Sequence, residues 1–512
     1  MKKNNKVMSF EDVIGNVEIK DNVIITPDKR YVTIVEIAPI NFDYKTALDK
    51  EKIIDGFAQL TKIGPVTMQI KSLSRRADVN KYINVLNHDF ALEKDSHLKP
   101  YQDDYMRLIK RLGVYSGLSR RFFIVLEACG NDTEKIKSFD DAVYYLDKAK
   151  QTIRRFIRNC GNAVIRHGDE NNFLINTLYE FANKNKTIYD LKERKQAFYD
   201  EAKRITDNDE ELLDNFDVPV STLVSPEKIE FYSEYCVVDG TYYSFLYIPS
   251  KEYPSRISYA WLTGIICGAE GIDVDIFVDK KDSKSMKNKL RTKIRINKAR
   301  MNTMKNTEGE NYEEIGKSIQ SSAYIRNRLN SGEDFFYVTT MFTLSASSLE
   351  ELYEKNSAVK DMFGAIDVDL NECEYKIKEA FSSYMPLNTL DPYIYGKGKR
   401  NMTTSGLSAF YPFNSFEVSD TDGILLGISD NKTMLVIDNF DTSKYSNANI
   451  TLLGTSGVGK TFTLQTMCLR FRLKGVQTFV IAPIKGDEYE RGCKEVNGEF
   501  LTISSGSKTR IN

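Results

Sequence analysis

Hydrophobic residues in positions 1–185 follow two repeats, the alternation of β-strands and the three-to-four-residue spacing of helices. Two β-branched runs, 22–26 and 31–37, flank the turn Pro27-Asp28-Lys29 and predict a hairpin. The same pattern predicts further strands at 65–70 and 121–128, and helices at 45–61, 79–90, 101–112 and 139–158. Because strands and helices are mixed without regular alternation, we expect an α+β domain in residues 1–185.

A change of composition marks a boundary after this first part. Residues 186–226 are highly charged, poor in large aliphatic side chains and end in two proline-containing pairs, which indicates a linker. Residues 227–400 then return to a mixed pattern, with Asp239-Gly240 as a strong hairpin signal. This middle α+β domain is expected to contain strands at 274–278 and 335–344, and helices at 259–267, 280–305, 350–362 and 374–384.

The last part, residues 401–512, has the pattern expected at the start of an α/β domain. A β-ribbon is predicted at 424–427 and 433–437. Apolar runs at 449–453 and 478–481 then flank a helical pattern at 462–473, which predicts a βαβ unit.

Between the first apolar run and that helix, residues 454–461 fit the phosphate-loop pattern of two glycines, a lysine and a hydroxyl. Backbone amides in such a turn, at the start of a helix, attract phosphate groups. Lys460, the candidate catalytic residue, would reach the β and γ phosphates, and the Thr461 hydroxyl would bind the accompanying Mg²⁺. The candidate ATP-binding residues are therefore Gly454, Thr455, Ser456, Gly457, Val458, Gly459, Lys460 and Thr461.

Overall composition limits other kinds of function. The chain has 512 residues, enough for about three domains. Its 71 Lys and Arg nearly balance its 72 Asp and Glu, so the overall charge gives no strong signal for nucleic acid or for an acidic substrate. The seven cysteines form no C-x-x-C pair and only three histidines are present, so neither a disulfide framework nor a zinc site is indicated. No apolar stretch approaches the roughly 20 residues that span a bilayer. We therefore expect a cytoplasmic protein that touches membranes only peripherally.

Local charge leaves several interpretations open. The predicted helix at 280–305 is strongly basic, and it would be a solvated face, a contact for anionic lipid or an acidic partner, or a nucleic-acid contact. Two further clusters would either bind an acidic partner or form a solvated face: Arg120 with Arg121, and Arg154 with Arg155 and Arg158.

The approach to the phosphate loop resembles the conjugative-transfer ATPases of type IV secretion systems. The matching residues, in order, are Ala409-Phe410-Tyr411-Pro412-Phe413, Asp422-Gly423-Ile424, Leu426-Gly427, Asp438, Asn449 and the phosphate loop. The stretch Ile481-Ala482-Pro483 departs from the family pattern, because Ala482 stands where an aspartate is usual. The Lys, Asn and Ile usage is similar to that of Gram-positive conjugative elements.

This resemblance implies a membrane-associated hexamer that docks on inner-membrane channel proteins and has a RecA-like motor domain. Hydrolysis also needs acidic residues beside the metal, and Asp487 and Glu488 are expected to be solvated loop residues instead. We therefore expect the sequence to stop inside the motor domain, with weak or no hydrolysis and misfolding from residue 440 onward. Two alternatives remain open: a hexameric DNA translocase or helicase, and a structural docking subunit with a vestigial nucleotide site.

Overall fold

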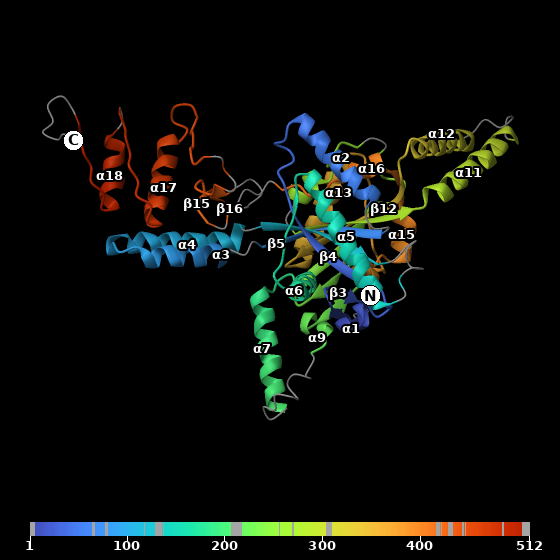
Figure 1. Ribbon diagram of the computed structural model, residues 1–512, viewed down its shortest axis with the longest axis horizontal. Coiled ribbons are helices and arrows are strands. Elements are labelled where there is room, and N and C mark those ends of the chain that lie inside the picture. The colour runs from blue at the N-terminus through green and yellow to red at the C-terminus, as the bar shows by residue number, and fades with distance from the viewer. Residues whose placement is uncertain are drawn as a thin grey trace. The chain divides into compact units, whose positions relative to one another are not determined.

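Strands from both the first and the middle part of the sequence pair in one large antiparallel sheet in the computed structural model (Figure 1). The structure describes residues 6–63, 67–76, 80–116, 118–128, 136, 138–205, 218–254, 257–268, 271–303, 310–415, 420, 422–428, 434–442, 445, 447–483 and 486–503. Two compact units divide the chain: residues 1–74 with 120–415, and residues 75–119 with 416–512.

The first half of the first unit begins at the N-terminus of the chain. Its elements are β1 (Lys6–Met8), α1 (Phe10–Ile14), β2 (Glu18–Lys20), β3 (Val23–Ile25), β4 (Tyr31–Ala38), α2 (Ala47–Ile63), β5 (Thr67–Arg76), β6 (Leu118–Glu127), α5 (Phe139–Asn159), β7 (Ala163–Val164), α6 (Glu170–Ala182), α7 (Ile188–Ile205) and α9 (Val220–Val224). The predicted hairpin at Pro27-Asp28-Lys29 is confirmed, because Ile24 pairs with Val32 and Ile25 with Tyr31.

The second half contributes the other strands of the sheet. Its elements are β8 (Ile229–Phe231), β9 (Cys236–Val238), β10 (Thr241–Tyr247), α10 (Thr263–Gly268), β11 (Ile272–Lys281), α11 (Ser283–Thr303), α12 (Glu310–Asn330), β12 (Phe335–Ala346), α13 (Leu349–Gly364), β13 (Asn371–Glu372), α14 (Ile377–Tyr384), α15 (Pro392–Gly398), β14 (Arg400–Thr403) and α16 (Thr404–Ser408). The Asp239-Gly240 hairpin is confirmed by the pairing of Val238 with Thr241, with positive φ at both turn residues.

The second unit is smaller. It contains α3 (Asn80–Leu92), the 3₁₀ turn η1 (Ser96–Leu98), α4 (Lys99–Ser116), β15 (Ile424–Ile428), β16 (Met434–Ile437), α17 (Lys460–Leu473) and α18 (Asp487–Glu495). The predicted β-ribbon is confirmed as the antiparallel pair of β15 and β16. The helices α3 and α4, which lie between β5 and β6 in the sequence, thus belong with the phosphate-loop segment.

Residues 18–182, which include α3 and α4 of the second unit, and residues 229–384 repeat one order of elements. Three strands are followed by a helix, a strand, two helices, a strand, a helix, a short strand and a helix, in residues 18–182 and again in 229–384. Within the described residues the sheet order is symmetric about its middle: β8-β9-β10-β12-β11 meets β5-β6-β4-β3-β2. The short strands take equivalent places as well, β7 beside β4 and β13 beside β10.

A buried ion pair lies at the junction of the halves, where β5 pairs antiparallel with β11. Lys71 and Asp275 face each other across this pair, and both side chains are only 1% exposed. Gln69 Nε2 donates a hydrogen bond to Asp275 Oδ1 at 2.8 Å. Burial raises the pKa of Asp275 to about 6 in spite of Lys71, and burial lowers the pKa of Lys71. The two charges therefore depend on each other at the middle of the sheet.

Both faces of the sheet are covered by helices. Phe122 on β6 contacts Phe413 with ring centroids 6.2 Å apart, whereas its neighbour Phe123 contacts Phe181 of α6 on the opposite face at 5.7 Å. Because successive strand residues point to opposite faces, a strand covered on both sides reads as a continuous apolar run. The run at 122–126 is fully buried for this reason.

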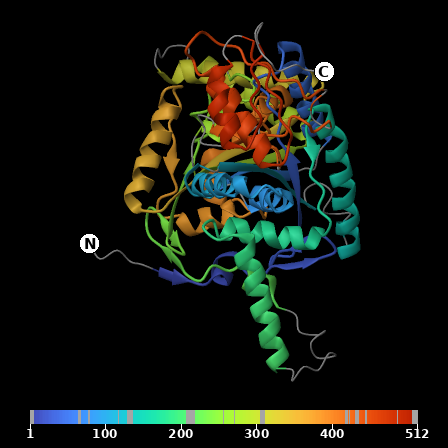
Figure 2. The ribbon, with the colours of Figure 1, turned by 90° about the vertical axis from the view of Figure 1, so that its left-hand side faces the viewer.

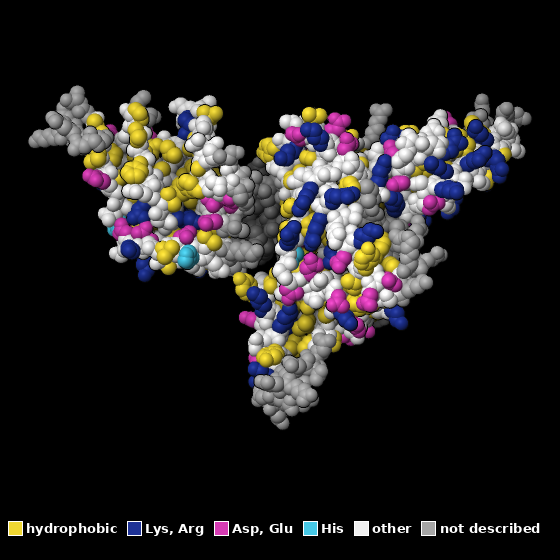
Figure 3. Space-filling model, viewed as in Figure 1, with side chains coloured by type: hydrophobic (Ala, Val, Ile, Leu, Met, Phe, Trp, Pro, Cys, Tyr) yellow, Lys and Arg dark blue, Asp and Glu magenta, His cyan; other side chains and the backbone are white. Residues whose placement is uncertain are grey.

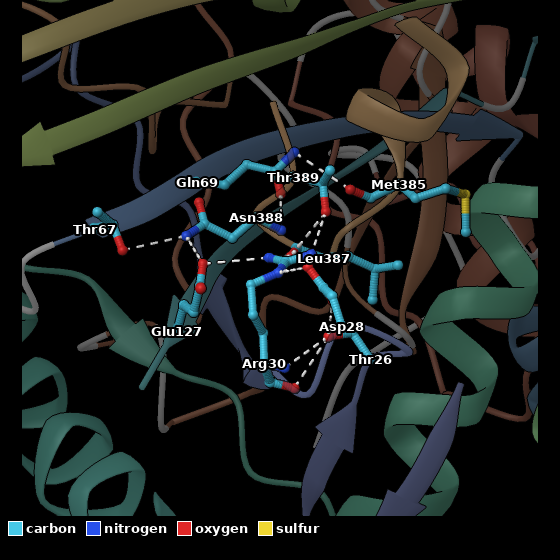
Figure 4. Close-up of polar contacts among 10 residues, drawn as sticks. All are labelled: Thr26, Asp28, Arg30, Thr67, Gln69, Glu127, Met385, Leu387, Asn388 and Thr389. Carbon is cyan, nitrogen blue, oxygen red and sulfur yellow. Dashed lines mark hydrogen bonds and ion pairs between the residues drawn. The ribbon is translucent and has the colours of Figure 1, made fainter. Parts of the chain in front are cut away.

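A polar cluster ties the chain after α14 to the first half (Figure 4). Arg30 donates hydrogen bonds to the Leu387 carbonyl oxygen at 3.0 Å and to Thr389 Oγ1 at 2.7 Å. Asn388 Nδ2 donates to Glu127 Oε2 at 2.8 Å, and the Asn388 backbone amide donates to Gln69 Oε1 at 3.0 Å. These contacts join residues more than 250 positions apart, so the two halves fold as one body.

The structure divides the chain differently from the expected segments 1–185, 186–226, 227–400 and 401–512. The segment predicted to be a linker begins with the 18-residue helix α7, which projects from the first unit (Figures 1 and 2). Leu191 and Ala202 of α7 are buried. The many charged residues around them made this helix look like a linker in the sequence. The acidic run 207–211 lies outside the described residues. Residues 401–415 complete the first unit, because Phe410, Tyr411 and Phe413 are buried in its core.

Arg121, one of the basic residues considered for an acidic partner, has an internal role. It donates to Glu36 Oε1 at 2.6 Å and Oε2 at 2.8 Å, and it also pairs with Glu180. Among the described residues, no helix combines the length and the apolar character needed to cross a membrane.

We predict that replacing one member of the Lys71–Asp275 pair is costly and that replacing both is not. Lys71→Met should lower the free energy of unfolding of the first unit by about 3–5 kcal/mol, because it leaves a buried carboxylate unpaired. Lys71→Met/Asp275→Leu should recover most of that loss. Urea unfolding followed by the emission of Trp261, the only tryptophan, reports on this unit. A double variant as unstable as the single one would contradict this account.

Acid should weaken the first unit through Glu36. Burial would raise the pKa of this carboxyl, but the hydrogen bonds from Arg121 hold it at about 2, below its ordinary 4.5. A lowered folded-state pKa stabilises the protein above the unfolded pKa, and this contribution is lost as the pH falls. We expect a loss of about 2 kcal/mol between pH 5.5 and pH 3, measured through Trp261, that is absent in Glu36→Gln. An unchanged pH profile in Glu36→Gln would refute the assignment.

Candidate nucleotide-binding site

The phosphate-loop segment forms a turn that leads directly into α17. Gly457 and Gly459 have φ values of 82° and 97°, a conformation that other residues rarely adopt. Gly459 is the N-cap of α17 and provides no side chain to cap the helix. In the described part of the chain, the backbone N–H groups of residues 457–461 have no hydrogen-bond acceptor. Free amides at a helix start are the donors that a phosphate group requires.

Lys460 lies across this loop. Its Nζ donates hydrogen bonds to the carbonyl oxygens of Gly454 at 2.7 Å and Thr455 at 2.6 Å. A Cβ at Gly454 would lie 2.7 Å from Val458 Cγ1, which explains why the loop closes best with glycine there. The ammonium group is thus held next to the free amides by contacts that an anion would replace.

These features fit the phosphates of ATP better than they fit a complete metal site. Thr461 is half-buried in the first turn of α17, next to the loop, and could offer its hydroxyl to Mg²⁺. In the residues that the structure describes, no group of three or more His, Cys, Asp or Glu side chains could hold a metal ion. Asp487 and Glu488, expected in a loop, instead begin α18 and are exposed.

The two apolar runs that flank the loop are not strands, so this prediction was wrong for the described residues. Residues 447–455 and 476–482 have no strand structure. Leu453 and Ile481 are 90% and 91% exposed, and Phe479 is 82% exposed. A strand needs a hydrogen-bonded neighbour, and neither run pairs with the other or with the ribbon of β15 and β16. The predicted helix between them is confirmed as α17, but the expected βαβ unit is not formed.

The helices α3 and α4 position the site by holding the C-terminal end of α17. Tyr82 and Tyr105 lie 2.9 Å apart between their hydroxyl oxygens. Tyr82 donates to the Gly423 carbonyl oxygen at 3.1 Å, and the Leu425 amide donates to Tyr105 at 3.0 Å. Desolvation by burial raises the pKa of Tyr82, so this phenol stays neutral and can donate. The pair of tyrosines therefore fixes the ribbon on which α17 packs.

Charged contacts complete this anchor. Lys474, just after α17, lies 2.9 Å from Asp89 Oδ2 and also pairs with Asp422. Burial would lower the pKa of Lys474, but the hydrogen bonds to Asp422 and Asp89 raise it. Arg472 pairs with Glu93 of the turn between α3 and α4, and Leu473 is 2% exposed. One end of α17 is therefore packed, while its first turn carries the exposed loop.

Sequence reasoning found the loop but not its support. The candidates Gly454 to Thr461 lie together as predicted, whereas Tyr82, Tyr105 and Lys474 were missed. The contacts of Tyr82 with Gly423, of Tyr105 with Leu425 and of Lys474 with Asp89 each span more than 300 positions in the sequence, so no local pattern reveals them. Asp422 and Gly423 were noted only through the family resemblance, and their contacts with Lys474 and Tyr82 give them a packing role.

No model of a known protein family matches this chain, and a search of curated proteins found no match.

We predict that the anchor at Lys474 controls the order of α17. Lys474→Met should leave Asp89 and Asp422 without their cation and speed amide hydrogen exchange in residues 467–473 by about tenfold. Exchange in the strands of the first unit should stay unchanged. Lys494→Met is the matched control, since among the described residues the Lys494 ammonium forms an ion pair with Glu490 alone, exposed on α18. Equal exchange in both variants would show that the anchor does not hold the helix.

Proposed function

We propose that this chain is an ATP-binding subunit of a conjugative type IV secretion apparatus. One observation carries the nucleotide part of the proposal: free amides of residues 457–461 and the Lys460 ammonium lie at the start of one helix. This combination suits the phosphates of a nucleotide. The family part rests on the motif order from Ala409 to Thr461.

In this proposal, Lys460 leaves the carbonyl oxygens of Gly454 and Thr455 and binds the β and γ phosphates. The amides of the loop bind the remaining phosphate oxygens, and Thr461 contacts Mg²⁺ through its hydroxyl. Bound MgATP supplies the phosphoryl group whose transfer to water would drive the apparatus. No carboxylate cluster accompanies Thr461 in the described residues, so binding is the property that these residues support directly.

The wider assembly is part of the same proposal. By resemblance, the subunit would form a hexamer, lie at the cytoplasmic side of the membrane and dock on inner-membrane channel proteins. The docking part of this proposal is assigned to the first unit, whose two halves share one continuous sheet. A RecA-like motor domain remains the expectation for the segment around α17.

Lys460→Ala should weaken binding of fluorescent ATP by about 10–100-fold, because a charge-assisted contact to phosphate is lost. Thr461→Ala should abolish the gain in affinity that Mg²⁺ gives the unchanged protein. Lys494→Ala removes an exposed lysine from the same unit and should bind like the unchanged protein. The proposal fails if Lys460→Ala binds ATP as well as Lys494→Ala does.

A further inference from the structure

The helical pair α11–α12 takes the same place in the second half of the first unit that α3–α4 takes after β5. Along the sequence, α3–α4 lies between strands β5 and β6, and α11–α12 lies between strands β11 and β12. The α3–α4 pair packs on the ribbon and on α17, as described above. The α11–α12 pair extends away from the sheet of its unit (Figure 1). Its surface in the described residues is therefore available to another molecule.

The charge of α11 is extreme for a chain that is neutral overall. Its 21 residues include eight Lys or Arg and no Asp or Glu. In the described part of the chain none of these eight forms an ion pair, and all are exposed except the half-buried Lys287. Their dark blue side chains gather over α11 in Figure 3. Such a cluster of unpaired cations binds polyanions and releases their counterions.

The packing of α11 excludes an ordinary membrane-binding helix. Met286, Leu290 and Ile294 are buried, and the first two belong to a small core with Leu329 of α12. Asn297 Nδ2 donates to Ser318 Oγ of α12 at 3.1 Å along the same face. The apolar face that would enter a lipid surface is therefore already used, and Ile296 is the one large apolar side chain exposed in the described residues of α11.

The exposed part of α11 has two basic rows on either side of a narrow crest. With 3.6 residues per turn, one row contains Lys284, Lys287, Arg291, Arg295 and Lys298, and the other contains Lys289, Lys293 and Arg300. Ser285, Asn288, Thr292, Ile296 and Ala299 lie between them, so the crest is small and polar except for Ile296. On the side of the second row, Ser285, Asn288, Thr292 and Ile296 of the crest also line an open, shallow hollow of about 630 Å³.

We propose that α11 binds the major groove of duplex DNA, without reading its sequence. A groove about 12 Å wide admits one helix, and its two walls carry phosphates. The crest would enter the groove while each basic row meets one phosphate strand. From Lys284 to Arg300 the helix rises about 24 Å, which corresponds to about seven base pairs. The crest has few groups for bidentate base contacts, so the binding is electrostatic.

Other polyanions fit this surface less well. Single-stranded nucleic acid is usually held by stacked aromatic rings, and α11 contains no aromatic residue. The major groove of duplex RNA is too deep and narrow for a helix. An anionic membrane is flat, so it would contact one row at a time and leave the other row free. The two-row arrangement therefore favours duplex DNA over these ligands.

The test is fluorescence anisotropy of a labelled 20-base-pair DNA duplex of random sequence with the full chain. With about eight phosphate contacts, the slope of log affinity against log salt should be about −7. Duplex RNA and single-stranded DNA of equal length should bind at least about tenfold more weakly. Vesicles containing phosphatidylserine should compete poorly. Duplex binding that is absent at 50 mM salt, or equal affinity for duplex RNA, would overturn the proposal.

Variants test the contribution of each basic row to DNA binding separately. Lys284→Gln/Arg291→Gln/Arg295→Gln and Lys289→Gln/Lys293→Gln/Arg300→Gln should each reduce the slope to about −4.5. Lys45→Gln/Lys148→Gln/Lys251→Gln removes three exposed charges elsewhere in the same unit and should leave the slope unchanged. Thr292→Glu keeps all cations but adds a carboxylate on the crest, and should weaken binding more than tenfold. Loss of binding with one row variant only, or unaltered binding by Thr292→Glu, would refute groove insertion. ATP binding should be the same in all of these proteins, so the result is independent of the nucleotide site.

Discussion

The antiparallel contact between β5 and β11 is the constraint on which the first unit depends. Residues 67–72 of β5 pair with residues 274–279 of β11, and this joins two five-stranded halves into a continuous sheet. Without it, each half would expose a long strand edge with unpaired backbone groups. The Lys71–Asp275 pair lies in this contact, so two buried charges of opposite sign must meet for the halves to close. A misaligned register would leave both charges unpaired in the interior. The pair therefore helps to determine the register, although burying its two charges costs desolvation free energy.

The same contact determines where the helical insertions leave the sheet. Because β5 and β11 run antiparallel, the C-terminal end of β5 lies beside the N-terminal end of β11. The chain therefore enters α3–α4 and α11–α12 from opposite ends of the central strand pair.

Local patterns predicted most of the elements but few of the contacts between them. The hairpins at Pro27-Asp28-Lys29 and Asp239-Gly240 were predictable because turn residues and alternation lie within a dozen positions. The β5–β11 contact joins residues about 200 positions apart, and its key residues are a lysine and an aspartate, types that normally indicate a surface. The helix α7 was interpreted as a linker for a similar reason, since its few buried residues lie among many charges.

At the candidate site, the loop and the helix could be predicted from the sequence, but the two flanking strands could not. The loop and the start of α17 depend on glycine geometry and helix termination, which are local and were predictable. The apolar runs at 449–453 and 478–481 fit strands equally well by composition, but a strand exists only where a neighbour completes its hydrogen bonds. β-propensity describes how a side chain fits a sheet, and it does not supply the partner.

The two helical insertions show how one scaffold can separate two kinds of surface. The tyrosine hydroxyls of α3–α4 contact the ribbon, and the carboxylates of Asp89 and Glu93 pair with cations at the end of α17. These polar groups therefore have partners within the protein. In α11–α12, Met286, Leu290 and Leu329 pack in the contact between the two helices, and the eight Lys and Arg of α11 form no ion pair in the described residues. The net charge of −1 does not reveal this difference, because it adds the paired charges of one pair of helices to the unpaired charges of the other. Charge that is unpaired and carried on a projecting element acts on other molecules, whereas charge that is paired in a core acts on stability.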